Sequence, residues 1–98
     1  MAAYIIFVRD RIRDPAGFAD YGAVAGGTLA GHPAKPLVVY HPMETLEGPS
    51  AEAMVMIEFP TMADARAWYD SPAYVEARQL RFASADFRVF ITDGLPAA

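Results

Sequence analysis

The segment MVMIEFPTMADARAWYDSPAYVEARQLR, residues 54–81, decides how this chain folds. Apolar side chains recur at every second position from Ala53 to Phe59, and this period is typical of a strand. Pro60 ends the strand, because proline has no N–H to donate to a β-ladder. The segment therefore opens with a strand that presents one regular apolar face.

Two helical stretches are predicted after this strand. Thr61 is the expected N-cap of the first, with Asp64 three residues later in a spacing that resembles a capping box. Ser71 and Pro72 supply a second cap and a proline at the first helical position. The residue before a proline avoids the α conformation, so we expect a break or a kink near residues 70–71.

The rest of the chain completes an alternating order of elements. A helix is expected to begin at Pro15, with Asp14 as its N-cap, and to stop near Gly31. Runs of β-forming residues predict three further strands at Tyr4–Val8, Leu37–Tyr40 and Asp86–Thr92. The order β-α-β-β-α-β predicts an α+β, ferredoxin-like fold, in which a four-stranded antiparallel sheet carries both helices on one face. We expect one domain, residues 1–98, with a short tail after Gly94.

The second face of this sheet is also rich in apolar residues. Tyr4–Val8 and Leu37–Tyr40 are apolar on both sides, and Met54, Met56 and Phe90 add to the face away from the helices. An uncovered sheet of this kind exposes more than the roughly 300–600 Å² that is typical of the largest apolar patch on a monomer. A homodimer paired through this exposed sheet face is therefore expected.

Composition excludes several classes of function. The net charge is −4 and the eight basic residues form no run, so we expect neither nucleic acid nor a membrane as a partner. The chain has no cysteine, which excludes disulfides and zinc–thiolate sites. His41, Glu44 and Glu47 lie in a turn-rich stretch that gives them no common face, so no metal is expected, and no motif implies a cofactor. The start of the chain does not read as a signal peptide, and a cytoplasmic protein is the expectation.

Several motifs occur in an order that resembles a known bacterial family. They are Asp14-Pro15, Tyr21, Leu46-Glu47-Gly48, the segment from Glu58 to Arg81, and a closing strand before Gly94. This order resembles the family called domain of unknown function 1330, of the ferredoxin-like, dimeric α+β barrel superfamily. The resemblance implies the fold and a dimer. Proteins of similar fold include cofactor-independent monooxygenases, isomerases of small lactones and haem enzymes. Where that family usually has two glycines after the histidine at position 32, this chain has Pro33 and Ala34.

Two residues are candidates for catalysis. His32 lies on a loop at a helix end and would titrate near neutrality, which suits a general base, although it could also cap a helix carbonyl or face solvent. Glu58 is a carboxylate in an apolar strand, on the face that a dimer would bury. A catalytic carboxylate, an ion pair with Arg88 and a place at the rim of the sheet all remain open for Glu58.

Aromatic residues on the two helical segments suggest a ligand pocket. The predicted ligand-binding residues are Tyr21, His32, Trp68, Tyr69, Tyr74 and Arg81. Arg78 and Arg81 could bind a carboxylate or a phosphate, but pairing with Asp70, Glu76 or the partner subunit is the favoured interpretation. One hypothesis is thus a small-molecule-binding homodimer, possibly an enzyme that needs no cofactor, monooxygenase-like or isomerase-like. The alternative is a non-catalytic dimerisation or interaction module, whose aromatic residues are simply core.

Overall fold

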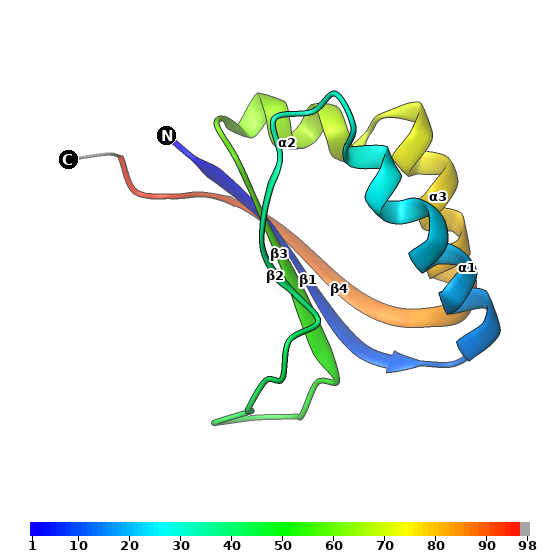
Figure 1. Ribbon diagram of the computed structural model, residues 1–98. Helices are drawn as coiled ribbons and strands as arrows, with labels where there is room; N and C mark the ends of the chain where they lie inside the picture. The colour runs from blue at the N-terminus through cyan, green and yellow to red at the C-terminus, as the bar shows by residue number, and fades with distance from the viewer. Residues whose placement is uncertain (97–98) are drawn as a thin grey trace.

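The computed structural model describes residues 1–96; Ala97 and Ala98, the end of the expected tail, lie outside the described residues (Figure 1). The elements are β1 (Ala3–Ile12), α1 (Pro15–Ala25), the 3₁₀ turn η1 (Gly26–Leu29), β2 (Lys35–Val39), β3 (Ala53–Phe59), α2 (Met62–Tyr69), α3 (Pro72–Ser84) and β4 (Ala85–Asp93). The four strands form one antiparallel sheet in the order β2-β3-β1-β4. This is the α+β, ferredoxin-like fold that the sequence predicts.

The segment that decides the fold behaves as expected. Thr61 caps α2, because its Oγ1 accepts a hydrogen bond from the N–H of Asp64 at 3.1 Å. Ser71 caps α3 in the same way, by accepting from the N–H of Tyr74 at 3.3 Å. The predicted break is complete: α2 ends at Tyr69 and α3 begins at Pro72, so three α-helices are present where two helical regions were expected.

The first helix begins where the sequence predicts, but its cap differs. Asp14 is extended and precedes Pro15 at the first helical position, yet its side chain makes no capping hydrogen bond. The helix passes into the 3₁₀ turn η1, and Gly31 then takes a φ of 80°, a conformation that favours glycine. The N–H of Ala34 donates to the carbonyl of His32 at 2.8 Å, which makes a tight turn around Pro33.

Three strands differ from their predicted bounds, β4 by only one residue at each end. β1 continues from the expected end at Val8 to Ile12, because it pairs with β4 beyond a bulge between Arg9 and Arg11. β2 runs from Lys35 to Val39 and not to Tyr40. Pro36 is tolerated inside β2 because this strand lies at the edge of the sheet. Tyr40 takes a φ of 54°, in the left-handed region, where the strand ends.

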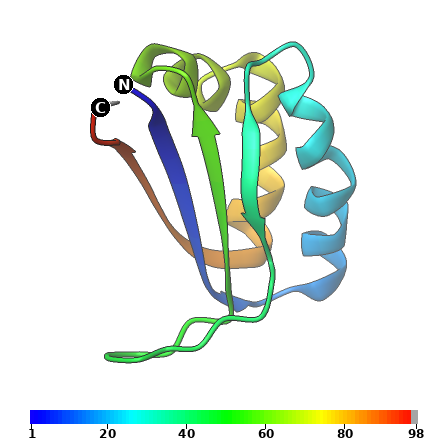
Figure 2. The same ribbon diagram turned by 60° about the vertical axis from the view of Figure 1, so that its left-hand side comes forward.

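All helices cover one face of the sheet, and the opposite face is bare (Figures 1 and 2). On the helix side, Ile5, Phe7, Ile57 and Phe59 are buried against α2 and α3, with Tyr74 fully buried above them. Burial alternates along β1 and β3, so each strand presents its other residues to the bare face.

An apolar row crosses the bare face through all four strands. Val38 lies opposite Met56, Met56 opposite Ile6, and Ile6 opposite Phe90. Phe90 is 51% exposed, and the other three are half-buried. Glu58 lies to one side of this row. The described chain therefore leaves the face uncovered that the sequence predicts to be apolar.

No helix of the described residues could cross a lipid bilayer, since the longest, α3, has 13 residues.

The cap at Thr61 should contribute measurably to stability. Thr61→Ala removes the oxygen that accepts from Asp64, so we expect the free energy of unfolding to fall by about 0.5–2 kcal/mol in urea denaturation. Thr45→Ala, in the exposed loop between β2 and β3, serves as the control and should change it little. Equal stabilities of the two variants would mean that the hydroxyl of Thr61 does not hold the start of α2.

Candidate functional site

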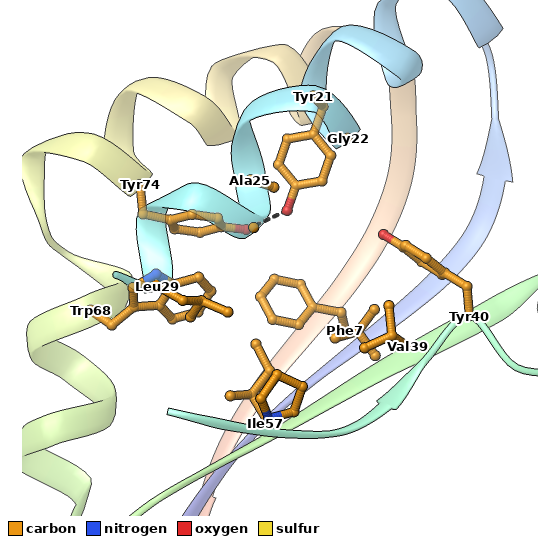
Figure 3. A pocket seen from close by; sticks show the side chains of 13 residues that line it. Phe7, Tyr21, Gly22, Ala25, Leu29, Val39, Tyr40, Ile57, Trp68 and Tyr74 are labelled. Carbon is orange, nitrogen blue, oxygen red and sulfur yellow. Dashed lines mark hydrogen bonds between the residues drawn. The ribbon is translucent and has the colours of Figure 1, made fainter. Parts of the chain in front are cut away.

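A cavity of about 290 Å³ opens between the helices and the edge of the sheet that carries β2. Figure 3 shows its wall, to which α1, η1, β1, β2, β3, α2 and the start of α3 contribute. Its lining residues are predominantly apolar or aromatic: Phe7, Tyr21, Gly22, Ala25, Gly26, Leu29, Pro36, Val39, Tyr40, Val55, Ile57, Trp68 and Tyr74. A cavity of this size and apolar character is typical of a site for a small molecule.

Two glycines of the first helical region keep the cavity open. A Cβ atom placed on Gly22 or on Gly26 would meet no other atom within 4 Å. Both residues line the cavity, so space is left where other residues would carry side chains. Gly17, near the start of α1, differs from them: a Cβ placed there would lie 2.7 Å from Oδ2 of Asp14 and 3.2 Å from Cβ of Ser84 in α3.

Tyrosine hydroxyls make the polar part of the cavity. The hydroxyls of Tyr21 in α1 and Tyr74 in α3 lie 2.8 Å apart and form a buried hydrogen bond. Figure 3 shows the hydroxyl of Tyr40 directed into the same space. The guanidinium of Arg9 lies 5.0 Å from the ring centroid of Tyr40 and 5.2 Å from that of Phe18. The cation–π contact with Arg9 helps to hold the Tyr40 ring in place.

The pKa values of Tyr21 and Tyr74 determine how many protons their two hydroxyls carry. Burial raises the pKa of Tyr21 far above its usual value, and Tyr74 acts in the same direction. Burial also raises the pKa of Tyr74, against the opposing effects of its hydrogen bond to Tyr21 and of Arg81. Both hydroxyls are therefore protonated at neutral pH. Only one of the two protons lies in the hydrogen bond between the hydroxyls, and no described residue accepts the other, which is thus available to a group inside the cavity.

Arg81 lies next to this pair without lining the cavity. It is only 2% exposed, and its Nε and Nη2 atoms have no hydrogen-bond partner among the described residues. Its guanidinium lies 5.0–5.6 Å from the ring centroids of Phe7, Phe82 and Phe87. These rings offset part of the cost of burying the charge, but no carboxylate of residues 1–96 forms an ion pair with it.

The expected pairing of the helix arginines with Asp70 or Glu76 is wrong. Asp70 instead pairs with Arg66 one turn earlier, at 2.9 Å. Arg78 donates to the backbone carbonyl of Tyr69 at 3.0 Å and lies 4.5 Å from the centroid of that ring. The break between α2 and α3 exposes this carbonyl to Arg78, and the sequence spacing of the charges could not show that.

Trp68 is the single tryptophan of the chain and is held firmly in the wall of the cavity. Its Nε1 donates to Oγ1 of Thr28 at 3.1 Å, and Thr28 in turn donates to the carbonyl of Ala25 at 2.6 Å. Its ring centroid lies 4.2 Å from that of Tyr74. The η1 turn and α2 are thus connected by a hydrogen bond at the base of the cavity.

The predicted site residues fall into separate groups. Tyr21, Trp68 and Tyr74 surround the cavity together. Tyr69 packs behind Tyr74, with ring centroids 5.5 Å apart, and does not line it. His32 is half-buried on the loop before β2, also outside the lining.

Glu58 lies on the bare face of the sheet, away from the cavity. Its Oε1 accepts from the hydroxyl of Tyr4 at 3.3 Å. The predicted pair with Arg88 is wrong, because the register places Glu58 opposite Tyr4 and Arg88 opposite Val8, further along β1. Arg88 instead donates through two nitrogens to Asp10, both at 3.0 Å. Nothing brings Glu58 and His32 to the cavity, so the two catalytic candidates do not share a site with the aromatic ones.

The sequence missed several residues of the cavity wall, above all Phe7, Val39 and Tyr40. The sequence pattern places Phe7 and Val39 in strands and Tyr40 at the end of a strand, but it indicates no ligand-binding role for any of them. The side-chain alternation of β1 could have placed Phe7 beneath the helices. Nothing in the sequence indicated the left-handed backbone of Tyr40.

Within residues 1–96, no three His, Asp or Glu side chains gather closely enough to hold a metal ion.

Several solved structures share this fold. The RPA0582 protein of unknown function from Rhodopseudomonas palustris has a TM-score of 0.73 at 18% identity, with 98% of this chain and 84% of that chain covered. A dimeric ferredoxin-like protein of unknown function from Thermobifida fusca has a TM-score of 0.64 at 15% identity, covering 94% and 90%. SnoaB, a cofactor-independent oxygenase from Streptomyces nogalater, has a TM-score of 0.64 at 9% identity, covering 98% and 94%.

At these identities the similarity shows the fold alone. No curated protein matches the chain. The family described as Domain of unknown function (DUF1330) matches residues 2–95, and this chain belongs to that family, as its motifs indicated.

Proposed function

We propose that this protein is a homodimer that binds a small, mainly apolar molecule in the cavity of each subunit. The observation that carries the proposal is the cavity of about 290 Å³, around which Tyr21, Trp68 and Tyr74 are gathered. If these aromatic residues were only core, their interior would be filled and their hydroxyls satisfied. The open space and the spare hydroxyl proton both favour binding over a purely structural role.

The wall of the cavity defines the kind of molecule that fits. Phe7, Trp68 and Tyr74 offer aromatic surfaces, and Val39 and Ile57 offer aliphatic ones. A flat, apolar compound of one or two rings would fill such a space. Its polar atoms would have to accept hydrogen bonds at the tyrosine end, because no carboxylate among the described residues lines the cavity.

Catalysis without a cofactor is a second candidate function, and the Tyr21–Tyr74 pair supports it. A buried hydroxyl whose proton faces a bound molecule can donate to an oxygen of that molecule during a reaction. The oxygenase from Streptomyces nogalater supports the same idea by analogy of fold only. His32 and Glu58 lie outside the cavity and are not needed for this proposal.

The homodimer in this proposal uses the bare face of the sheet. The apolar row of Val38, Met56, Ile6 and Phe90 would be its centre. Charged groups lie toward the ends of the strands, with Glu58 on one side and Arg88 paired to Asp10 on the other. An apolar centre with a polar rim is the usual arrangement of an interface. The neighbour from Thermobifida fusca is described as dimeric.

Filling the cavity should abolish binding without unfolding the protein. The probe is para-nitroanisole, a neutral aromatic compound that quenches tryptophan fluorescence, with Trp68 as the reporter. Gly22→Leu places a side chain where nothing lies within 4 Å, so we expect the affinity to fall roughly tenfold or more. Gly27→Leu is the matched control, since Gly27 is equally unobstructed but does not line the cavity. Equal affinity in both variants, or no quenching in the unaltered protein, would contradict the proposal.

A charge in the middle of the bare face should separate the subunits. Light scattering should give twice the chain mass for the unaltered protein. Met56→Lys buries an unpaired ammonium in the proposed interface, so we expect the monomer mass at micromolar concentration. Val24→Lys, at an exposed position of α1 on the helix side, is the control and should leave the dimer intact. A monomer without any substitution would refute the homodimer.

A further inference from the structure

Arg81 carries a positive charge that the described part of the chain leaves without a counter-charge. The side chain is 2% exposed, two of its three guanidinium nitrogens have no hydrogen-bond partner, and its charge lies among three phenylalanine rings. Burying a charge is costly unless it is paired, and a Leu or Met would fill the same space without that cost. A buried cation next to a cavity therefore requires an explanation that packing alone does not supply.

Phe7 and the tyrosines connect this charge to the cavity. Phe7 lines the cavity, and the guanidinium of Arg81 lies 5.6 Å from the centroid of its ring. The charge of Arg81 lowers the pKa of Tyr74, Tyr21 and Tyr40, against the larger effect of burial on each. One buried cation thus acts on three tyrosines of the cavity wall.

We propose that the ligand of this cavity carries a single anionic oxygen, as in a phenolate or an enolate, which binds at the tyrosine end. Three features support this proposal: the spare hydroxyl proton of the Tyr21–Tyr74 pair, the hydroxyl of Tyr40, and the charge of Arg81, which is unpaired among the described residues. This inference rests on the proposed function and names the chemical class of its ligand. Arg81 acts in it as a positioning residue, because it does not line the cavity and so does not touch the ligand.

The geometry favours a phenolate or enolate over a carboxylate. A carboxylate is usually bound by an arginine through two parallel hydrogen bonds at direct contact. Arg81 does not line the cavity and cannot make such a contact there. Hydroxyl donors converging on one point suit a single oxygen better.

The titratable and charged side chains near the tyrosine end of the cavity come from several surrounding elements. Tyr21 comes from α1, Tyr74 and Arg81 from α3, and Tyr40 from the end of β2, with Arg9 of β1 over the ring of Tyr40. No acidic residue of the described chain lines the cavity. Burial raises the pKa of a phenol in this site, as it does for Tyr21, Tyr40 and Tyr74, so a bound anion depends on the hydroxyl hydrogen bonds and on the charge of Arg81 to outweigh burial. Under the proposal these two effects prevail, and an acid that enters gives up its proton more readily than it does in water.

The test uses para-nitrophenol, whose neutral and ionised forms absorb at different wavelengths. Bound to the unaltered protein, its pKa should lie about one unit below that of the free probe, as followed by absorbance across pH. In Arg81→Met this shift should disappear, and the ionised probe should bind roughly tenfold more weakly. Arg78→Met is the matched control, on the same helix with a side chain that contacts Tyr69, and should retain the shift.

Further measurements keep the test decisive. Should Arg81→Met fail to fold, the direction of the shift in the unaltered protein still decides, and Arg81→Lys should retain part of it while Tyr74→Phe reduces it. A probe whose pKa is unchanged or raised on binding overturns the proposal, as does an equal shift in Arg81→Met. Tighter binding of para-nitrobenzoate than of para-nitrophenolate overturns the choice of a single oxygen. If para-nitroanisole binds although the anion results are negative, the proposed function stands and only the class of ligand is wrong. If none of the probes binds, the proposed function and the class of ligand are both wrong.

Discussion

The register of β1 between β3 and β4 is the constraint on which the rest of the structure depends. It places Ile5 and Phe7 beneath the helices and Ile6 in the row that crosses the bare face. A slip by one residue would exchange these faces and remove the floor of the cavity together with the apolar row. Long antiparallel ladders on both sides, and the bulge between Arg9 and Arg11, fix this register.

Phe7 shows how one strand position serves the whole helix side. Its ring centroid lies 6.1 Å from that of Trp68, 6.3 Å from that of Tyr74 and 6.4 Å from that of Phe87, in edge-to-face arrangements. Such pairs add to the free energy gained by burying the rings. Phe7 also lies under the guanidinium of Arg81, so it separates the cavity from the buried charge while it contacts both. Phe7 therefore contributes both to the packing of the helix side and to the surroundings of the buried charge.

The cavity exists because the helix side is packed unevenly. α2 and α3 cover β1 and β3 with large aromatic residues, whereas α1 and η1 bring Gly22, Ala25 and Gly26 over the edge at β2. Glycines weaken a helix by roughly 1 kcal/mol each relative to alanine, so tertiary contacts must hold α1 in place. The hydrogen bond between Tyr21 and Tyr74 is one such contact, and it joins α1 to α3 at the polar end of the cavity. Stability and the proposed binding thus draw on the same two side chains.

The sequence by itself determined the order of elements, the caps at Thr61 and Ser71, the break between α2 and α3 and the apolar character of the bare face. These follow from periods, proline positions and capping residues, which act over a few neighbouring residues. It also identified Tyr21, Trp68 and Tyr74 as residues that could act together. Only the tertiary structure decided that His32, Tyr69 and Glu58 lie elsewhere, that Phe7 and Tyr40 join the cavity, and that Arg81 is buried with no acidic partner among residues 1–96. Such facts depend on register, helix crossing and one left-handed residue, and these are set by contacts between residues far apart in the chain.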